Sequence, residues 1–195
     1  MHDRALTPTV ARTLSDVYAR LLAARGHQRW WPGETPFEVA VGAVLTQNTA
    51  WTNVERAIAN LKAAGALDAG TILALDEPAL AALLRPAGYF NVKARRLRAL
   101  VRYLCDEAGG DPARLDGRDV PRLRASLLAV PGVGRETADS ILLYAVGLPV
   151  FVVDAYTRRI FGRLGRIDPD ADYDAIRAVF EAALPRDVGL YNDYH

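Results

Sequence analysis

The stretch RASLLAVPGVGRETADSILLYAVGLPVFVVDAYTRRIFGRLG, residues 124–165, decides the fold. It predicts a helix, a tight turn at 131–134, a second helix ending near Gly147, a short extended VFVV run and a further helix that opens near Asp154. The glycines of the turn permit unusual backbone conformations and let an anion approach the main chain. The N–H groups of the turn and of the helix start at Arg135 therefore form a candidate phosphate site. An ordinary helix–helix turn would have the same sequence.

Composition favours an all-α protein that folds without covalent cross-links. Apolar residues make up 51% of the 195 residues, mostly Ala and Leu, which is enough to build a core from helices. The single cysteine, Cys105, excludes intramolecular disulfides and any four-cysteine zinc or iron–sulfur site within these residues. The N-terminus has no apolar core of signal-peptide length, and no apolar run is long enough to cross a membrane. We expect a cytoplasmic protein.

Basic residues are clustered, although the net charge is only +1. Solvated helix faces and a nucleic-acid partner are equally compatible with this pattern. The first cluster contains no acid, and the second follows Asp154 directly. The clusters are Arg85, Lys93, Arg95, Arg96, Arg98 and Arg102, and then Arg158, Arg159, Arg163 and Arg166.

Local signals extend the helical pattern along the chain. Thr35, Pro36 and Glu38 combine a capping box with proline at the first helical position, and the following FEVAVGAVLT is apolar nearly all round. This segment is predicted to be the central buried helix. Residues 111–120 are predicted to form a loop. The other predicted helices are about 9–24, 51–64, 77–84, 91–107, one opening at Pro121, 173–184 and 186–195.

Three ordered motifs carry a resemblance to a known family. They are VGAVLTQNT at 41–49, GYFNxKA at 88–94, and LxxPGVGRxTA followed by VVD, ending at Asp154. The chain resembles the helix-hairpin-helix superfamily of DNA glycosylases, typified by endonuclease III. The resemblance implies two helical lobes that flank a DNA-binding cleft: residues 33–147, which carry the hairpin, and residues 1–32 with 148–195. In the subgroup with the best match the C-terminal helix continues further, so the chain is expected to be a truncated form.

By this resemblance, Asp154 is the catalytic aspartate. Cleavage of an N-glycosidic bond builds positive charge on the sugar, and a fixed carboxylate stabilises that charge and activates water. A helix cap alone is the competing interpretation of Asp154. Relatives that also cut the DNA backbone have a lysine two residues after the last hairpin glycine, where this chain has Glu136. The resemblance therefore implies a monofunctional glycosylase without lyase activity, without a cofactor and without an iron–sulfur cluster.

The pattern of tryptophans and of Glu136 is most similar to that of the endonuclease III-like 3-methyladenine DNA glycosylases. This similarity implies that the flipped base, an alkylated purine, is held among aromatic faces. Packing between helices is the alternative role for the tryptophans. The implied base pocket consists of Trp30, Trp31, Trp51 and Glu136.

The resemblance also implies which residues contact double-stranded DNA. Gln47 and Phe90 would fill the space left by the extruded nucleotide, although they could instead be a helix-end residue and a core aromatic. Phosphate contacts are implied for Arg85, Lys93, Arg95, Gly132, Gly134, Arg135 and Thr137. The backbone carbonyls of Leu128, Val130 and Val133 are implied to hold a monovalent cation.

Two rival functions stay open at this point. One is an oxidised-pyrimidine glycosylase of endonuclease III type, which Glu136 disfavours. The other is a non-catalytic module that binds DNA through the hairpin. For all three we expect a monomer that acts on the nucleoid and has no membrane partner.

Overall fold

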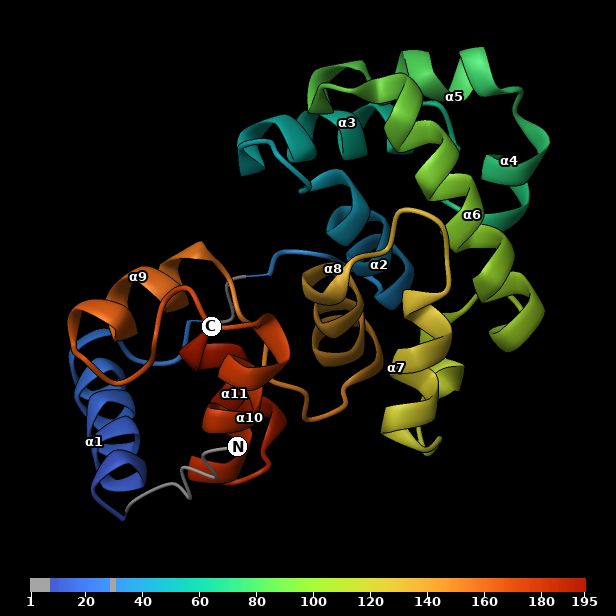
Figure 1. The fold of residues 1–195 in the computed structure, drawn as a ribbon. Helices are drawn as coiled ribbons and strands as arrows, with labels where there is room; N and C mark the ends of the chain where they lie inside the picture. The colour runs from blue at the N-terminus through green and yellow to red at the C-terminus, as the bar shows by residue number, and fades with distance from the viewer. Residues whose placement is uncertain (1–7, 29–30) are drawn as a thin grey trace. The chain divides into compact units, whose positions relative to one another are not determined.

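The computed structural model describes residues 8–28 and 31–195. Eleven α-helices and no β-strand occur in these residues, so the all-α prediction is confirmed. The chain divides into two compact units (Figure 1). Unit 1 consists of Met1–Trp30 and Pro149–His195, and unit 2 is Trp31–Leu148.

Helix α2 (Pro36–Leu45) is the buried centre of unit 2. It begins where predicted, because the Thr35 side chain accepts a hydrogen bond from Glu38 N at 3.1 Å. Its residues 38–45 are all buried, and three helices pack around it: α3 (Trp51–Ala63), α6 (Phe90–Ala108) and α8 (Arg135–Ser140). The other helices of the unit before the turn at 131–134 are α3 (Trp51–Ala63), α4 (Ala69–Ala74), α5 (Glu77–Leu83), η1 (Arg85–Ala87), α6 (Phe90–Ala108), η2 (Pro112–Leu115) and α7 (Val120–Leu128).

The helix after the turn changes type partway along. It starts as α8 (Arg135–Ser140) and continues as a π-helix, η3 (Ile141–Val146), where we had predicted one regular helix. Gly147 ends it with a φ of +83°, and Leu148 N donates to Leu142 O at 2.9 Å. Because its hydrogen bonds span five residues, the π-helix presents its side chains at other positions than a regular α-helix would. This segment packs against α2.

The short helices α4 and η2, like the three-residue η1, were not predicted. Asp68 caps α4 by accepting from Thr71 N at 2.9 Å, and Asp111 caps η2 by accepting from Ala113 N at 3.0 Å. The second lies in the segment 111–120 that we had predicted to be a loop. Both helices are too short to show a periodic apolar pattern, so only their capping residues indicate them.

Unit 1 joins the two ends of the chain around an aromatic core. Helix α1 (Pro8–Arg25) packs beside α10 (Tyr173–Ala183), as Figure 1 shows in blue and red. Phe151 stacks on Phe180 with ring centroids 4.2 Å apart, and Tyr194 OH donates to Leu14 O at 2.8 Å. The remaining helices of the unit are α9 (Ala155–Arg163) and α11 (Val188–Tyr194).

The helices of residues 8–28 and 31–195 were compared with the requirements of a membrane span. None of them combines the length and the apolar character that a bilayer crossing requires.

Candidate active site

Asp154 is the N-cap residue of α9, and its carboxylate is held asymmetrically. Oδ1 accepts hydrogen bonds from Thr157 N at 2.7 Å and Thr157 Oγ1 at 2.8 Å. Both of these hydrogen bonds go to the same oxygen of the carboxylate. One oxygen therefore fixes the side chain, and the other can face a developing positive charge or a water molecule.

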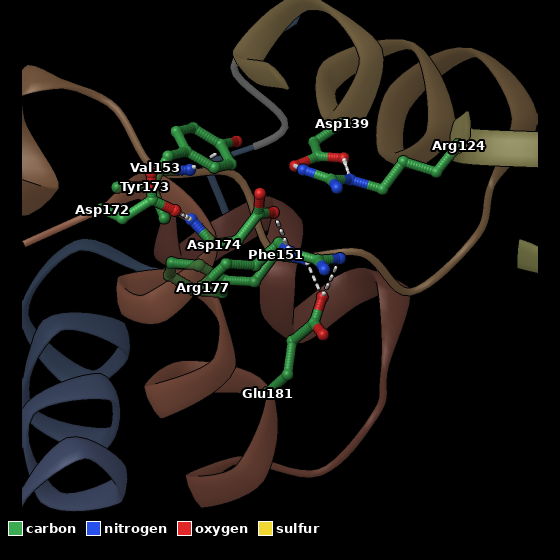
Figure 2. Close-up of polar contacts among 9 residues, drawn as sticks. All are labelled: Arg124, Asp139, Phe151, Val153, Asp172, Tyr173, Asp174, Arg177 and Glu181. Carbon is green, nitrogen blue, oxygen red and sulfur yellow. Dashed lines mark hydrogen bonds and ion pairs between the residues drawn. The ribbon is translucent and has the colours of Figure 1, made fainter. Parts of the chain in front are cut away.

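Side chains hold the extended segment that leads to Asp154. Phe151 N donates to Glu181 Oε1 at 3.0 Å, and Val153 N donates to Tyr173 OH at 3.2 Å (Figure 2). Arg177 in turn lies 3.4 Å from Glu181 Oε1. The predicted VFVV run is thus extended without strand partners in the described residues, because helix α10 supplies the hydrogen-bond acceptors that a sheet would normally provide.

The turn between α7 and α8 depends on one of its two glycines for its shape. Gly132 has a φ of +88°, and a Cβ at this position would lie 2.2 Å from Arg96 Cγ. Gly134, in contrast, has a φ of −89°, which other residues adopt readily, so of these two glycines only Gly132 has a backbone conformation that favours glycine. Gly134 is the N-cap of α8 and provides no side-chain hydrogen bond to it. This arrangement leaves the helix start open to an external anion.

A buried ion pair joins the two helices of the hairpin. Arg124 on α7 donates from Nε to Asp139 Oδ1 at 2.6 Å and from Nη2 to Oδ2 at 3.1 Å (Figure 2). The Arg124 side chain is 11% exposed and that of Asp139 is fully buried. The two-point geometry fixes the position of α8 relative to α7. Sequence reasoning had assigned neither residue a role.

Gln47 connects the end of α2 to the hairpin. Its Nε2 donates to Gly132 O and to Thr137 Oγ1, each at 3.0 Å, and its Oε1 accepts from Arg96 Nη1 at 2.5 Å. Thr137 is buried, so its side chain serves this network, and only its backbone N–H remains a candidate for a phosphate contact. The role of Gln47 in filling the space left by an extruded nucleotide stays a prediction. In that role Gln47 would have to give up these hydrogen bonds.

The predicted phosphate contact of Lys93 is wrong. Its side chain is 2% exposed, and Nζ donates to Leu45 O at 2.9 Å and to Ala87 O at 2.7 Å. Burial, followed by the charge of Arg96, lowers the pKa of Lys93. Lys93 therefore connects α6 to the last residues of α2 and η1 inside unit 2, where a DNA phosphate has no access.

The other predicted phosphate-binding residues lie at the surface of unit 2. Arg135 is exposed in the first turn of α8, next to Glu136, the exposed residue predicted for the base pocket, and Arg85 and Arg95 are exposed near α6. Arg95 pairs with Glu77 at 3.1 Å, an exposed contact that a phosphate can displace. In the hairpin, Val130 O already accepts a hydrogen bond from Val133 N at 3.0 Å. A monovalent cation on this turn stays a prediction.

An aromatic cluster occurs in unit 2 at the predicted base pocket. Trp31 lies edge-on to Trp51 with ring centroids 5.6 Å apart, and nearly parallel to Tyr144 at 4.8 Å. Both indoles pack over α2 at Gly42, where a Cβ would come within 3.5 Å of Trp31. Tyr144, in the π-helix, was not among the predicted residues. Trp30 lies outside the described residues.

The profile of the HhH-GPD superfamily of base excision DNA repair proteins matches residues 41–186. The chain belongs to this superfamily. The match includes both the hairpin and Asp154, so the family resemblance is confirmed.

Individual HhH-GPD relatives agree with this assignment. A protein of Methanocaldococcus jannaschii, provisionally named a DNA repair glycosylase, is 52% identical over 92% of this chain and 82% of its own length. The 3-methyladenine DNA glycosylase of H. pylori, solved with bound 1,N6-ethenoadenine, is 29% identical with a TM-score of 0.75, covering 96% and 92% of the two chains. An endonuclease III trapped covalently on DNA is 25% identical with a TM-score of 0.78, covering 97% and 84%.

The exposed aromatic residue before α6 of this HhH-GPD protein is Tyr89. Tyr89 is 73% exposed and has a φ of +45°, whereas Phe90 is half-buried as the first residue of α6, with Arg85 Cζ 5.9 Å from the centre of its ring. A ring that inserts into a duplex has to be exposed. Sequence reasoning had chosen Phe90, because the motif alone does not show which aromatic faces solvent.

Tyr89→Ala is therefore expected to weaken binding to duplex DNA with an abasic-site analogue about tenfold, by removing a stacking contact. The melting temperature should change little, because the ring is exposed. Phe90→Ala is the matched comparison and should lower the melting temperature more than the affinity. Fluorescence anisotropy and thermal melting measure both effects. A larger affinity loss in Phe90→Ala, at equal folding, would assign the role to Phe90.

Proposed function

We propose that this HhH-GPD protein is a monofunctional glycosylase that hydrolyses the bond between deoxyribose and an alkylated purine in duplex DNA. The observation that carries the proposal is the carboxylate of Asp154, which Thr157 holds in place through two hydrogen bonds to Oδ1 at the start of α9. A carboxylate held in this way stabilises positive charge without reorganising during the reaction.

The proposed reaction needs no cofactor. The C1′–N bond breaks, and its electron pair leaves with the base, which neutralises an alkylated purine that was cationic. Asp154 stabilises the positive charge left on the sugar, and water adds to C1′ and loses its proton to the Asp154 carboxylate. The N–H groups at the hairpin would bind a phosphate of the same DNA without reading its sequence.

Alkylated purines are the proposed substrates because of the aromatic cluster of Trp31, Trp51 and Tyr144. Electron-rich ring faces attract a cationic base, and a base that is already a good leaving group needs no strong acid. The similarity to the H. pylori enzyme supports this choice. Glu136, exposed at the start of α8, is proposed as a further residue of the base pocket.

The lysines of the chain argue against lyase chemistry. Lys62 and Lys93 are its only lysines. Lys62 lies 3.0 Å from both Glu34 and Glu38, and Lys93 is buried on backbone carbonyls. The hydrogen bonds that Lys62 donates to Glu34 and Glu38 raise the pKa of Lys62, which keeps its amine protonated and unreactive. Neither amine is suited to form a Schiff base with the sugar.

Two assays test the proposal. Incubation with methylated duplex DNA should release 3-methyladenine or 7-methylguanine, and borohydride trapping on the same DNA should give no covalent enzyme–DNA adduct. A strong adduct would overturn the monofunctional reaction. Release of thymine glycol in place of methylated bases would favour the endonuclease III type, and DNA binding without release of any base would favour the non-catalytic module.

A further inference from the structure

One face of α3 forms the wall of a hollow of about 230 Å³ in unit 2. Trp51, Glu55, Ile58 and Lys62 follow each other on this face at helical spacing. Trp31, Pro32, Gly33, Glu38 and Ala59 complete the lining. The hollow therefore has two indole rings at one end and an ion pair at the other, and its size suits a single small ring system.

The lining has a surplus of negative charge. Lys62 is the only cation among the lining residues that the structure describes, and Glu34 and Glu38 both lie 3.0 Å from its ammonium. The charge of Lys62 is therefore already neutralised. Glu55 makes no ion pair with the described cations, so its carboxylate remains as uncompensated charge beside the rings.

Glu55 is directly coupled to the aromatic end. Its Oε1 accepts a hydrogen bond from Trp51 Nε1 at 3.0 Å, one helical turn away. This bond fixes the edge of the Trp51 ring and holds the negative charge within reach of anything stacked on that ring. A cation over the ring is attracted both by the ring face and by the carboxylate, whereas a neutral ring gains only the stacking.

We propose that Glu55 is a specificity-determining residue that makes this hollow prefer a cationic purine ring to a neutral ring of the same shape. The inference rests on the proposed function, because the occupant is the alkylated purine that the enzyme would release. Glu55 itself takes no part in breaking the bond.

Binding of free ring compounds tests this preference without any DNA reaction. The permanently cationic 3,9-dimethyladeninium and neutral 9-methyladenine are titrated into the whole protein and followed by tryptophan fluorescence. The wild type should bind the cation about tenfold more tightly, a ratio expected from one partly screened charge at the rim of the hollow. Glu55→Gln keeps an acceptor for Trp51 Nε1 but removes the charge, so the ratio should approach one.

Glu107→Gln is the control for the loss of one negative charge. Glu107 is exposed and pairs with Arg118 at 2.7 Å, away from the lining of the hollow, so this variant should keep the wild-type ratio. An equal affinity of the wild type for both rings, no binding of the cation, or an unchanged ratio in Glu55→Gln would each overturn the role of Glu55.

Release from methylated DNA separates the two levels of the proposal. If the wild type releases methylated purines and Glu55→Gln releases them at the same rate with the same ratio of cation to neutral binding, the function stands and the inference fails. If the wild type releases none, yet the cation preference depends on Glu55, the proposed function fails and the inference about the hollow stands.

Discussion

Asp154→Asn is expected to lower the release of methylated purines at least about 100-fold, the usual scale for removing one electrostatic stabiliser of a transition state. The fold should survive, because asparagine caps a helix as well as aspartate does and its amide oxygen can replace Oδ1 in accepting from Thr157. The loss would therefore measure the missing charge. Single-turnover release from methylated DNA, together with thermal melting, tests both parts.

Asp187→Asn provides a matched control in the same unit. Asp187 caps α11 by accepting from Leu190 N at 2.7 Å, so the substitution makes the same chemical change at the same kind of position. It should leave release and melting temperature almost unchanged. Retention of at least a tenth of the wild-type release rate in Asp154→Asn would contradict the catalytic role, and equal losses in both variants would point to capping alone.

Breaking the Arg124–Asp139 pair is expected to have the largest effect on stability. Arg124→Met or Asp139→Leu leaves one charge buried without its main described partner, which costs about 3–5 kcal/mol. That loss is a large fraction of the roughly 5–15 kcal/mol that stabilises a typical domain. The double variant restores an apolar contact of similar volume and should recover most of the loss. Urea unfolding of the three variants measures the free energies.

The exposed pair of Arg118 and Glu107 serves as the reference. Its side chains are 41% and 46% exposed, so Glu107→Gln should cost at most about 1 kcal/mol. If the double variant at Arg124 and Asp139 is as unstable as the single variants, the stabilising role lies in other contacts of these residues. Losses below about 1 kcal/mol in the single variants would contradict the burial argument.

Helix starts were the most predictable part of the fold. Thr35 and Asp76 form their capping bonds three residues ahead in the chain, so the signal is local and readable. The all-α class was predicted from the composition, and the superfamily from motifs that are each short and continuous in the sequence. The π-helix was not predicted, because its apolar residues fit a regular helix equally well.

The site was predicted less completely, because its remaining parts depend on contacts between distant segments. Lys93 belongs to a basic cluster in the sequence, but its ammonium binds a carbonyl 48 residues away. Tyr144 meets Trp31, which is distant in the sequence, and Tyr89 is exposed with a left-handed backbone. Periodicity and motif spacing contain no information on these three outcomes.

The two units of the chain can fold at different times during synthesis, because unit 1 is made of two segments on either side of unit 2. Unit 2 is one continuous segment, so it can complete its contacts as soon as residue 148 has left the ribosome. Helix α1 is made first, but its contacts are with α10, and the bond from Tyr194 OH to Leu14 O closes a loop of 180 residues. A nascent chain can therefore form the hairpin, with its proposed phosphate site, before the surroundings of Asp154 exist.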